Sequence, residues 1–175
     1  MMSYRLIIIG SSCSGKTTLG ANLGKQMGLK HIDLDDLHWL PNWQHVDMET
    51  LRQKISDEIE GVEGWVITGA YSQTWTLTMP KATHVVFVDL PLSIVLYRFF
   101  TRTFRRMIKK EECCNGNTES WKTIFAKDSL LLWILKNYTK KRPQFLALQR
   151  DNRYPHLKFI HLKSRKDVQN LTSML

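Results

Sequence analysis

Residues 10–17 read Gly10-Ser11-Ser12-Cys13-Ser14-Gly15-Lys16-Thr17 and match the pattern G-x-x-x-x-G-K-[ST]. An apolar, β-branched run precedes them from Tyr4 to Ile9, and a helical pattern follows, in which Leu19, Leu23 and Met27 recur four residues apart. A strand, a glycine-rich turn and a helix in this order predict a phosphate-binding loop. The glycines let backbone N–H groups turn toward phosphate oxygens, and the start of the helix adds the positive end of its dipole.

Two side chains of this loop carry the expected chemistry. Lys16 would place a positive charge on the β- and γ-phosphates of a nucleotide, and the Thr17 hydroxyl would be a ligand for Mg²⁺. Cys13 stands at a free position of the pattern and is expected to fill space. The predicted nucleotide-binding set is Gly10, Ser11, Ser12, Cys13, Ser14, Gly15, Lys16, Thr17 and Thr18.

The chain length and composition fit one soluble domain. Its 175 residues are enough for a single compact core, so we expect one domain over residues 1–175. No stretch has the length of a transmembrane helix, and the N-terminus lacks a signal pattern, so no membrane partner is expected. Three cysteines, two of them adjacent, argue against a disulfide framework and favour the cytoplasm.

The positive charge is confined to the second half of the chain. Residues 1–89 hold 7 Lys and Arg against 10 Asp and Glu, whereas residues 90–175 hold 18 against 6. Such a surplus fits either a nucleic-acid surface or the surroundings of a nucleoside triphosphate, and charge alone does not separate the two.

Further short apolar runs alternate with helical patterns after the loop. This alternation predicts an α/β fold with a parallel sheet covered by helices. The expected strands after the first are residues 31–34, 65–68, 83–88 and 157–162, and the expected helices are residues 16–28, 47–59, 91–106, 121–138 and 165–174. Residues 35–47 are expected to form a loop, and residues 107–118 a less regular segment.

Acidic and aromatic side chains follow the second predicted strand. Asp33, Asp35 and Asp36 lie where a parallel sheet forms ligand sites, so one of them is a candidate to accept the proton of a substrate hydroxyl or to hold Mg²⁺ through water. The alternative is that they cap a helix or remain solvated. Trp39 and Trp43 would either stack on a planar acceptor or pin the loop to the core.

Two further strand ends are candidates. Gly69 and Tyr71 follow the third strand, where the backbone can approach a ligand beside an aromatic hydroxyl, although a plain turn is the alternative. Asp89 ends the fourth strand, and we expect it to cap the next helix rather than to reach Mg²⁺ through water.

A stripe of cations lies on one face of the helix predicted for residues 91–106. Arginines on a mobile segment can neutralise the charge that develops during phosphoryl transfer, so the arginines of this stripe are candidates for that role. The alternative is a solvated face, although no acidic side chain stands at i±4 to separate the charges. The stripe consists of Arg98, Arg102, Arg105, Arg106, Lys109 and Lys110.

Four segments carry a resemblance to a known family. GSSCSGKT (10–17), HIDLDDLHWLPNW (31–43), GWVITGAYS (64–72) and HVVFVDLP (84–91), followed by an arginine-rich helix, resemble the adenylate-kinase-related P-loop kinases called DNA topology modulation proteins. The resemblance implies a nucleoside monophosphate kinase-like fold with five parallel strands in the order 2-3-1-4-5. It also implies a lid over roughly residues 98–128, and ATP with Mg²⁺.

The resemblance also implies roles for single positions. Asp35 would face the acceptor, and Arg165 would lie in the loop after the last strand, near the adenine. Arg98 and Arg102 would be the catalytic cations of the lid, with Arg106 as a further candidate. One departure matters, because related sequences commonly carry an acidic residue where this chain has Thr68. If that acid normally orients magnesium or the acceptor, Asp33, Asp35 or Asp89 must take its place here, or the activity is weak.

These observations favour an ATP-dependent kinase that acts on a small acceptor, a nucleotide or nucleoside in the first place. The acceptor would be held by Asp33, Asp35, Trp39, Trp43 and Tyr71, with Lys16 as a catalytic residue. No N-K-x-D motif of switch GTPases is present, and the length suits a small kinase. The alternatives are a DNA-associated ATP-binding protein that uses the basic half as its contact surface, and an inactive nucleotide sensor. Nucleic acid is not the favoured partner, and the oligomeric state does not follow from the sequence.

Overall fold

A five-stranded parallel sheet forms the centre of the molecule. The computed structural model describes residues 3–119, 129–150 and 153–175. The strands run in the order β2-β3-β1-β4-β7. Their bounds are β1 (Arg5–Gly10), β2 (Lys30–Asp33), β3 (Trp65–Thr68), β4 (His84–Val88) and β7 (Lys158–Leu162). Counted within this sheet, the order is the predicted 2-3-1-4-5, and the predicted α/β class is confirmed.

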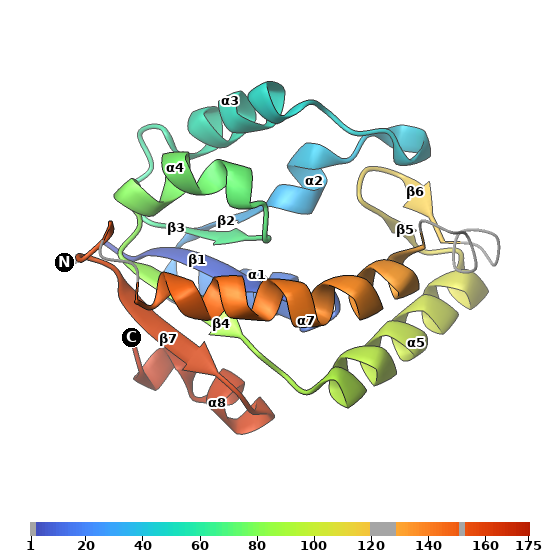
Figure 1. Ribbon diagram of the computed structural model, residues 1–175. Coiled ribbons are helices and arrows are strands. Elements are labelled where there is room, and N and C mark those ends of the chain that lie inside the picture. Colours follow the sequence, from blue (N-terminus) through green and yellow to red (C-terminus); the bar gives the residue numbers. More distant parts are fainter. Residues whose placement is uncertain (1–2, 120–128, 151–152) are drawn as a thin grey trace.

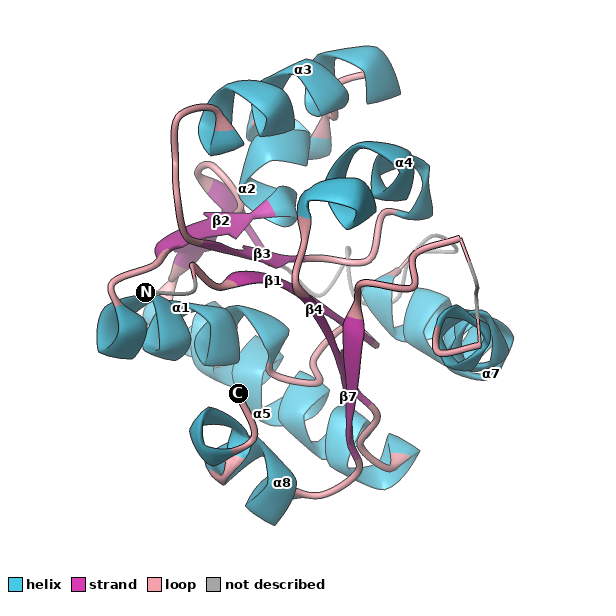
Figure 2. Ribbon diagram, turned by 90° about the vertical axis from the view of Figure 1, so that its left-hand side faces the viewer, coloured by secondary structure: helices cyan, strands magenta, loops and turns pink. Residues whose placement is uncertain are grey.

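Helices cover both faces of the sheet (Figure 2). Helices α1, α5 and α8 lie on one face, and α3 and α4 lie on the other (Figures 1 and 2). The described helices are α1 (Lys16–Met27), α2 (Leu34–His38), α3 (Met48–Ile59), α4 (Trp75–Thr78), α5 (Leu92–Lys109), α7 (Leu130–Leu148) and α8 (Arg165–Gln169). The short 3₁₀ turns are η1 (Pro41–Trp43), η2 (Ser72–Thr74), η3 (Met79–Lys81) and η4 (Leu171–Ser173). None of the helices in the described ranges is long and apolar enough to cross a membrane.

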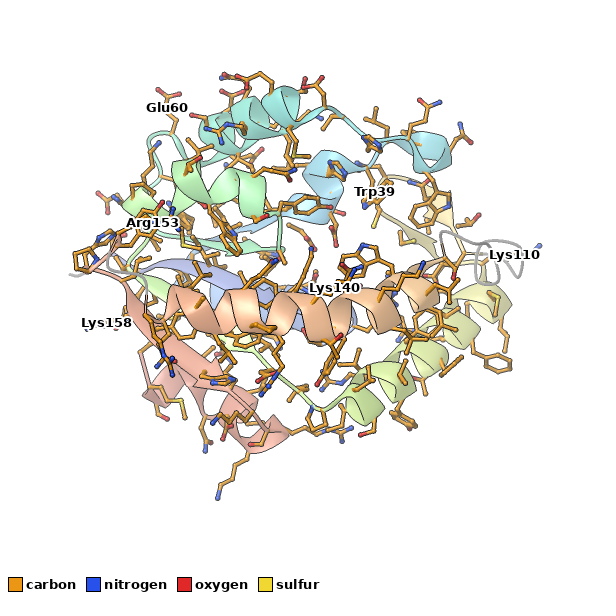
Figure 3. All side chains as sticks on the ribbon, viewed as in Figure 1. Trp39, Glu60, Lys110, Lys140, Arg153 and Lys158 are labelled. Carbon is orange, nitrogen blue, oxygen red and sulfur yellow. The ribbon has the colours of Figure 1, made fainter. Side chains whose placement is uncertain are left out.

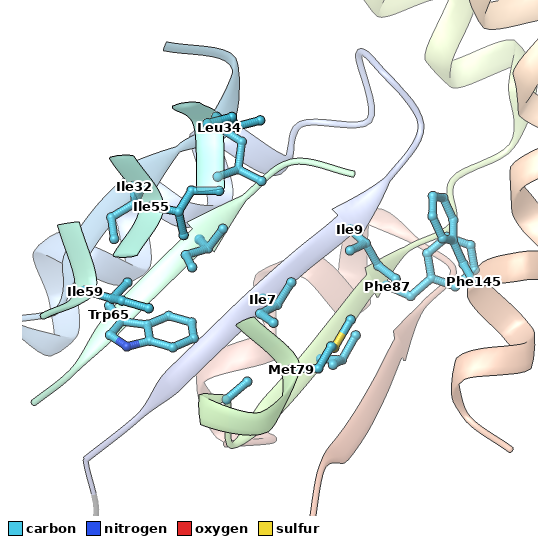
Figure 4. Packing of buried hydrophobic residues seen from close by; sticks show 14 residues of the cluster. Ile7, Ile9, Ile32, Leu34, Ile55, Ile59, Trp65, Met79, Phe87 and Phe145 are labelled. Carbon is cyan, nitrogen blue, oxygen red and sulfur yellow. The ribbon is translucent and has the colours of Figure 1, made fainter. Parts of the chain in front are cut away.

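Strand β1 supplies the core of both layers. It pairs with β3 on one side and β4 on the other, and its apolar residues are buried. Leu6 and Ile8 pack with α1 and α5, whereas Ile7 and Ile9 pack with α3 and with Phe87 of β4 (Figure 4). A continuous apolar run is what a strand covered on both faces requires.

Local signals in the sequence set the helix boundaries around the phosphate-loop motif. Helix α1 begins after Gly15, whose φ is 96°, and ends at Gly28, whose φ is 65°. Both values lie in the left-handed region that glycine adopts without steric cost. Asp47 caps α3, because its Oδ1 accepts a hydrogen bond of 2.8 Å from the Thr50 backbone N–H.

Several segments differ from the prediction. Helix α5 continues to Lys109, and α8 ends at Gln169 and is followed by the 3₁₀ turn η4 instead of continuing to residue 174. Residues 35–47 are not a plain loop, because Asp33 caps a short helix, α2, by accepting a hydrogen bond from the Asp35 backbone N–H. Helix α7 continues to Leu148 rather than ending at Tyr138. It buries Ile134 in one core layer and Phe145 in the other, so packing at both ends holds the helix across the edge of the sheet. The predicted helical residues 121–128 lie outside the described residues.

A small hairpin stands in the segment expected to be irregular. Strands β5 (Glu112–Cys113) and β6 (Asn117–Thr118) pair antiparallel. All three residues of the turn have positive φ, at 45° for Cys114, 63° for Asn115 and 80° for Gly116. The hairpin lies beside α2 and η1, two elements that are far from it in the sequence (Figure 1).

Candidate active site

The loop between β1 and α1 has the geometry of an anion-binding turn. Gly15 takes up a left-handed conformation, and the Ser14 N–H donates to the Ser11 carbonyl, so the chain curls around the start of α1. Lys16 Nζ donates a hydrogen bond of 2.7 Å to the Ser11 carbonyl. Burial lowers the pKa of Lys16, while the charge of Asp35 opposes that shift. The ammonium group therefore lies inside the loop and opposite a carboxylate.

Unsatisfied polar atoms beside the loop match the needs of a phosphate. Ser14 Oγ and Arg102 Nε are both buried, and neither has a hydrogen-bond partner. Buried donors without partners are uncommon, and the oxygens of a bound anion are acceptors that such donors require. Together with the ammonium group of Lys16 and the helix N-terminus, this donor set suits the phosphates of a nucleotide.

Two carboxylates from the end of β2 and the start of α2 face the loop. Burial and the neighbouring Asp35 charge raise the pKa of Asp33, while the Thr17 hydroxyl favours its ionised form. Asp35 accepts a hydrogen bond of 2.7 Å from the Tyr71 hydroxyl at its Oδ1. Burial and Asp35 raise the pKa of Tyr71, so this phenol stays protonated and acts as a donor. The hydroxyl of Thr17 and the carboxylate of Asp33 are hard oxygen ligands that Mg²⁺ accepts.

Thr68 stands where related sequences commonly carry an acidic residue, and Asp89 is a candidate to replace that acid. Both side chains have partners outside the phosphate loop. Thr68 Oγ1 lies 3.1 Å from His31 Nε2 and is fully buried. Asp89 does not cap α5 as expected, because it bonds to Arg142 Nε at 2.9 Å and to His161 Nε2 at 2.8 Å. Burial alone would raise the pKa of Asp89, but the hydrogen bonds from these two residues hold it below its usual value. Asp33 is therefore the carboxylate left beside the Thr17 hydroxyl.

The arginine stripe of α5 begins at the loop. Arg98 Nη1 donates to the Ser14 carbonyl, and burial together with the charge of Arg165 lowers its pKa. Arg102 lies close enough for its charge to lower the pKa of Cys13, although burial raises that pKa overall. Arg98 and Arg102 thus lie near the loop, and Arg165 lies near enough to Arg98 for its charge to act there.

Three further arginines of the stripe are paired, whereas Lys109 and Lys110 are exposed and have no ion pair among the described residues. Glu119 Oε1 accepts from Arg106 Nη1 at 2.9 Å and from Arg102 Nη2 at 3.4 Å, and Arg105 pairs with Glu111. These acidic partners lie beyond the end of the helix, so a search at i±4 within the helix does not find them.

The aromatic side chains form a cluster next to the carboxylates. His38 contacts Tyr71 at a ring-centroid distance of 4.8 Å and Trp39 at 5.1 Å. Trp43 packs edge-on against Trp39, is 36% exposed, and has no described ring contact with Tyr71. This arrangement favours the interpretation that Trp43 pins residues 35–47 to the core, whereas Trp39 lies between α2 and the hairpin (Figure 3).

The hairpin is fastened to the same segment by two asparagine side chains. Asn115 Nδ2 donates to the carbonyls of Asp36 and Trp39, both at 2.7 Å. Asn117 Nδ2 donates to the Leu40 carbonyl at 2.9 Å, and its Oδ1 accepts from the Trp43 N–H at 2.7 Å. We call this set of contacts the asparagine clasp.

Helix α7 contributes residues that the sequence analysis missed. The Lys141 ammonium lies 4.8 Å from the centroid of the Trp133 ring, and no described carboxylate or carbonyl accepts a hydrogen bond from it. Burial lowers the pKa of Lys141, while the charge of Asp35 raises it. A small cavity runs between α7 and the phosphate loop, lined among others by Gly10, Ser11 and Lys141. The only signal in the sequence was the basic run at 140–142, which lay beyond the expected end of the helix.

Comparison with known proteins establishes the fold class. No protein-family model matches the chain. The uncharacterized protein YqaC of Bacillus subtilis (strain 168) is 29% identical over 130 residues, which are 74% of this chain and 73% of that protein.

Solved kinase structures share the architecture at low sequence identity. A gluconokinase from Sinorhizobium meliloti 1021 is 16% identical with a TM-score of 0.55, over 98% of this chain and 89% of that one. A sugar kinase from Janibacter sp. HTCC2649 is 18% identical with a TM-score of 0.55, over 98% and 91% of the two chains. The shikimate kinase from Bacteroides thetaiotaomicron is 17% identical with a TM-score of 0.56, over 98% and 97%. The chain therefore has the fold of the P-loop kinases, and the DNA topology modulation family stays a prediction.

Proposed function

We propose that this protein is a kinase that transfers the γ-phosphoryl group of ATP to a hydroxyl of a small acceptor. The observation that carries the proposal is the position of the Lys16 ammonium in the phosphate loop, bonded to the Ser11 carbonyl and near enough to Asp35 for that charge to oppose the fall in the pKa of Lys16. Phosphoryl transfer needs a cation on the phosphates and a carboxylate that receives the proton of the attacking hydroxyl. The loop and the end of β2 supply both from rigid elements of the sheet.

Each neighbouring residue has a role in this scheme. Tyr71 holds Asp35 through its hydrogen bond and leaves the other carboxylate oxygen for the acceptor hydroxyl. Arg98 and Arg102 neutralise charge on the transferring group. Thr17 and Asp33 would hold Mg²⁺, whose charge would offset that of the phosphate oxygens. In this scheme Asp33 takes the place of the acid that Thr68 replaces.

The acceptor side favours a compound that carries a negative charge. Lys141 is a half-buried cation without a carboxylate partner among the described residues, and Asp35 lies within range of its charge. Nucleoside monophosphates and sugar acids both combine a free hydroxyl with an anionic group. The similar solved structures are named as a gluconokinase, a sugar kinase and a shikimate kinase, which supports a small acceptor.

The organisation of the chain completes the proposal. Residues 1–175 would form one kinase-like domain, and residues 98–128, which include the hairpin, would act as its lid. Arg165 would lie near the adenine, next to Arg98. The reaction would take place in the cytoplasm, and the chain would belong to the adenylate-kinase-related family that its motifs resemble.

Transfer of label from γ-labelled ATP to a panel of nucleoside monophosphates, nucleosides and sugar acids tests the scheme. With the best acceptor, Asp35→Asn is expected to lower kcat about 10²–10⁴-fold, because a positioned general base usually contributes a factor of this size to the rate. Asp36→Asn is the matched control, because Asp36 is exposed on the same short helix. Unchanged turnover in Asp35→Asn, or an equal loss in both variants, would contradict the role given to Asp35.

A further inference from the structure

Two adjacent thiols stand at the turn of the hairpin, outside the machinery described above. Cys113 ends β5 and is buried, and Cys114 begins the turn and is partly buried. Neither forms a disulfide. Their side chains interact, and this contact lowers the pKa of Cys113 to about 7 and raises the pKa of Cys114.

The surroundings of the two thiols differ in a way that gives them separate chemical roles. Arg106 lies near Cys113 and favours its thiolate, although burial and Glu119 act against it. Asp35 lies near Cys114 and disfavours a second negative charge there. A thiolate beside an arginine is a nucleophile, and an adjacent thiol resolves the sulfenic acid that forms on it by giving up its proton as its sulfur attacks.

The position of the pair connects it to the asparagine clasp. Cys113 is opposite Asn117 in the hairpin register, and Cys114 directly precedes Asn115. Both asparagines bond to the α2–η1 segment, so the turn conformation at Cys114, with its φ of 45°, fixes where these amides lie. A disulfide between adjacent residues closes a small ring that includes their peptide bond and restricts the backbone of both.

We propose that Cys113 and Cys114 form a peroxide-sensitive redox pair, and that their oxidation to a vicinal disulfide releases the hairpin from the α2–η1 segment. The Cys113 thiolate attacks hydrogen peroxide, an S–O bond forms, the O–O bond breaks, and the leaving hydroxide takes up a proton as water. The Cys114 sulfur then attacks the sulfenic acid, an S–S bond forms, and a second water leaves with the Cys114 proton. Two thiols are oxidised, and one peroxide is reduced to two waters.

The proposal does not depend on the kinase reaction, so its test uses the protein alone. Reduced protein is treated with hydrogen peroxide and mapped by peptide mass spectrometry. The peptide that carries both cysteines should lose two hydrogen atoms and regain them on reduction. In Cys114→Ser, the reaction should stop at a sulfenic acid on Cys113 that dimedone captures, and in Cys113→Ser neither product should form.

Hydrogen exchange reports whether the hairpin leaves the α2–η1 segment. Amides in residues 34–47 should exchange about 30-fold faster or more in the oxidised protein, because loss of the clasp removes the two Asn117 bonds together with those of Asn115, and the rate should recover on reduction. Peroxide-treated Cys114→Ser is the control, because it carries an oxidised sulfur but no ring. Oxidation of Cys13 with the pair left reduced would overturn the proposal, and so would a vicinal disulfide that leaves the exchange of residues 34–47 unchanged.

Discussion

Replacing Asn117 with alanine should detach the hairpin while leaving the rest of the fold intact. The Asn117 side chain is 3% exposed and makes two hydrogen bonds across the hairpin contact, to the Leu40 carbonyl and from the Trp43 N–H. A third bond, to the Cys114 carbonyl at 2.6 Å, stays within the turn. Asn117→Ala therefore removes two contacts that hold the hairpin on the α2–η1 segment.

The expected loss of docking free energy follows from these two bonds. A neutral hydrogen bond contributes about 1 kcal/mol net, so the docked state should lose about 2 kcal/mol relative to the detached state. That difference lowers the ratio of docked to detached molecules by about 30-fold. The loss is local, because the bonds join only the hairpin and residues 40–43.

Hydrogen exchange resolved by peptide measures this ratio. Amides of residues 34–47 that the docked hairpin shields should exchange about 30-fold faster in Asn117→Ala, because their exchange follows the population of the detached state. Asn137→Ala is the matched control, since the Asn137 amide bonds only to the Trp133 carbonyl of its own helix. Unchanged exchange in residues 34–47, or an equal increase in α3 and β7, would refute the docking role of Asn117.

Three further outcomes follow from the site. Asp33→Asn should raise the Mg²⁺ concentration needed for half-maximal turnover, whereas Asp36→Asn should not; an equal Mg²⁺ requirement in both would exclude Asp33 as a ligand. Because its partners lower the folded pKa of Asp89, this group stabilises the fold above its unfolded pKa of about 3.9 and loses that contribution as the pH falls through the lower folded value. Asp89→Asn should therefore be less stable than the natural chain by about 1–3 kcal/mol in neutral buffer, with the gap closing in acid; a gap that persists in acid denaturation curves would speak against the ionic role. Lys141→Met should raise the KM for an anionic acceptor about tenfold and leave the KM for a neutral acceptor unchanged. Lys140→Met is the control, because Lys140 is exposed on the same helix. Equal shifts in KM for both acceptors would show that Lys141 does not recognise charge.

The sheet could be predicted because its signals are local. The apolar run before Gly10, the glycines on both sides of α1 and the cap at Asp47 each act within a few residues. The strand order came from a resemblance rather than from periodicity, since pairing between distant strands leaves no local pattern.

The acceptor side was predicted only in part, because its contacts join distant segments. Asp35 and Tyr71 were each expected near a ligand, but their mutual hydrogen bond spans 36 residues. The bond between Asp89 and Arg142 spans 53 residues, so capping by Asp89 was the natural local expectation and was wrong. Lys141 was missed because the helix was expected to end at Tyr138, whereas burial of Phe145 extends it.

Transfer of the γ-phosphoryl group in Lys16→Ala tests the central claim most directly. With Mg²⁺, labelled ATP and the best small acceptor, the natural chain should form labelled product, and Lys16→Ala should do so about 100-fold more slowly or not at all. Lys25→Ala, on the exposed far end of the same helix, should match the natural chain. Full activity in Lys16→Ala, or no labelled acceptor while duplex DNA stimulates ATP hydrolysis, would contradict the account.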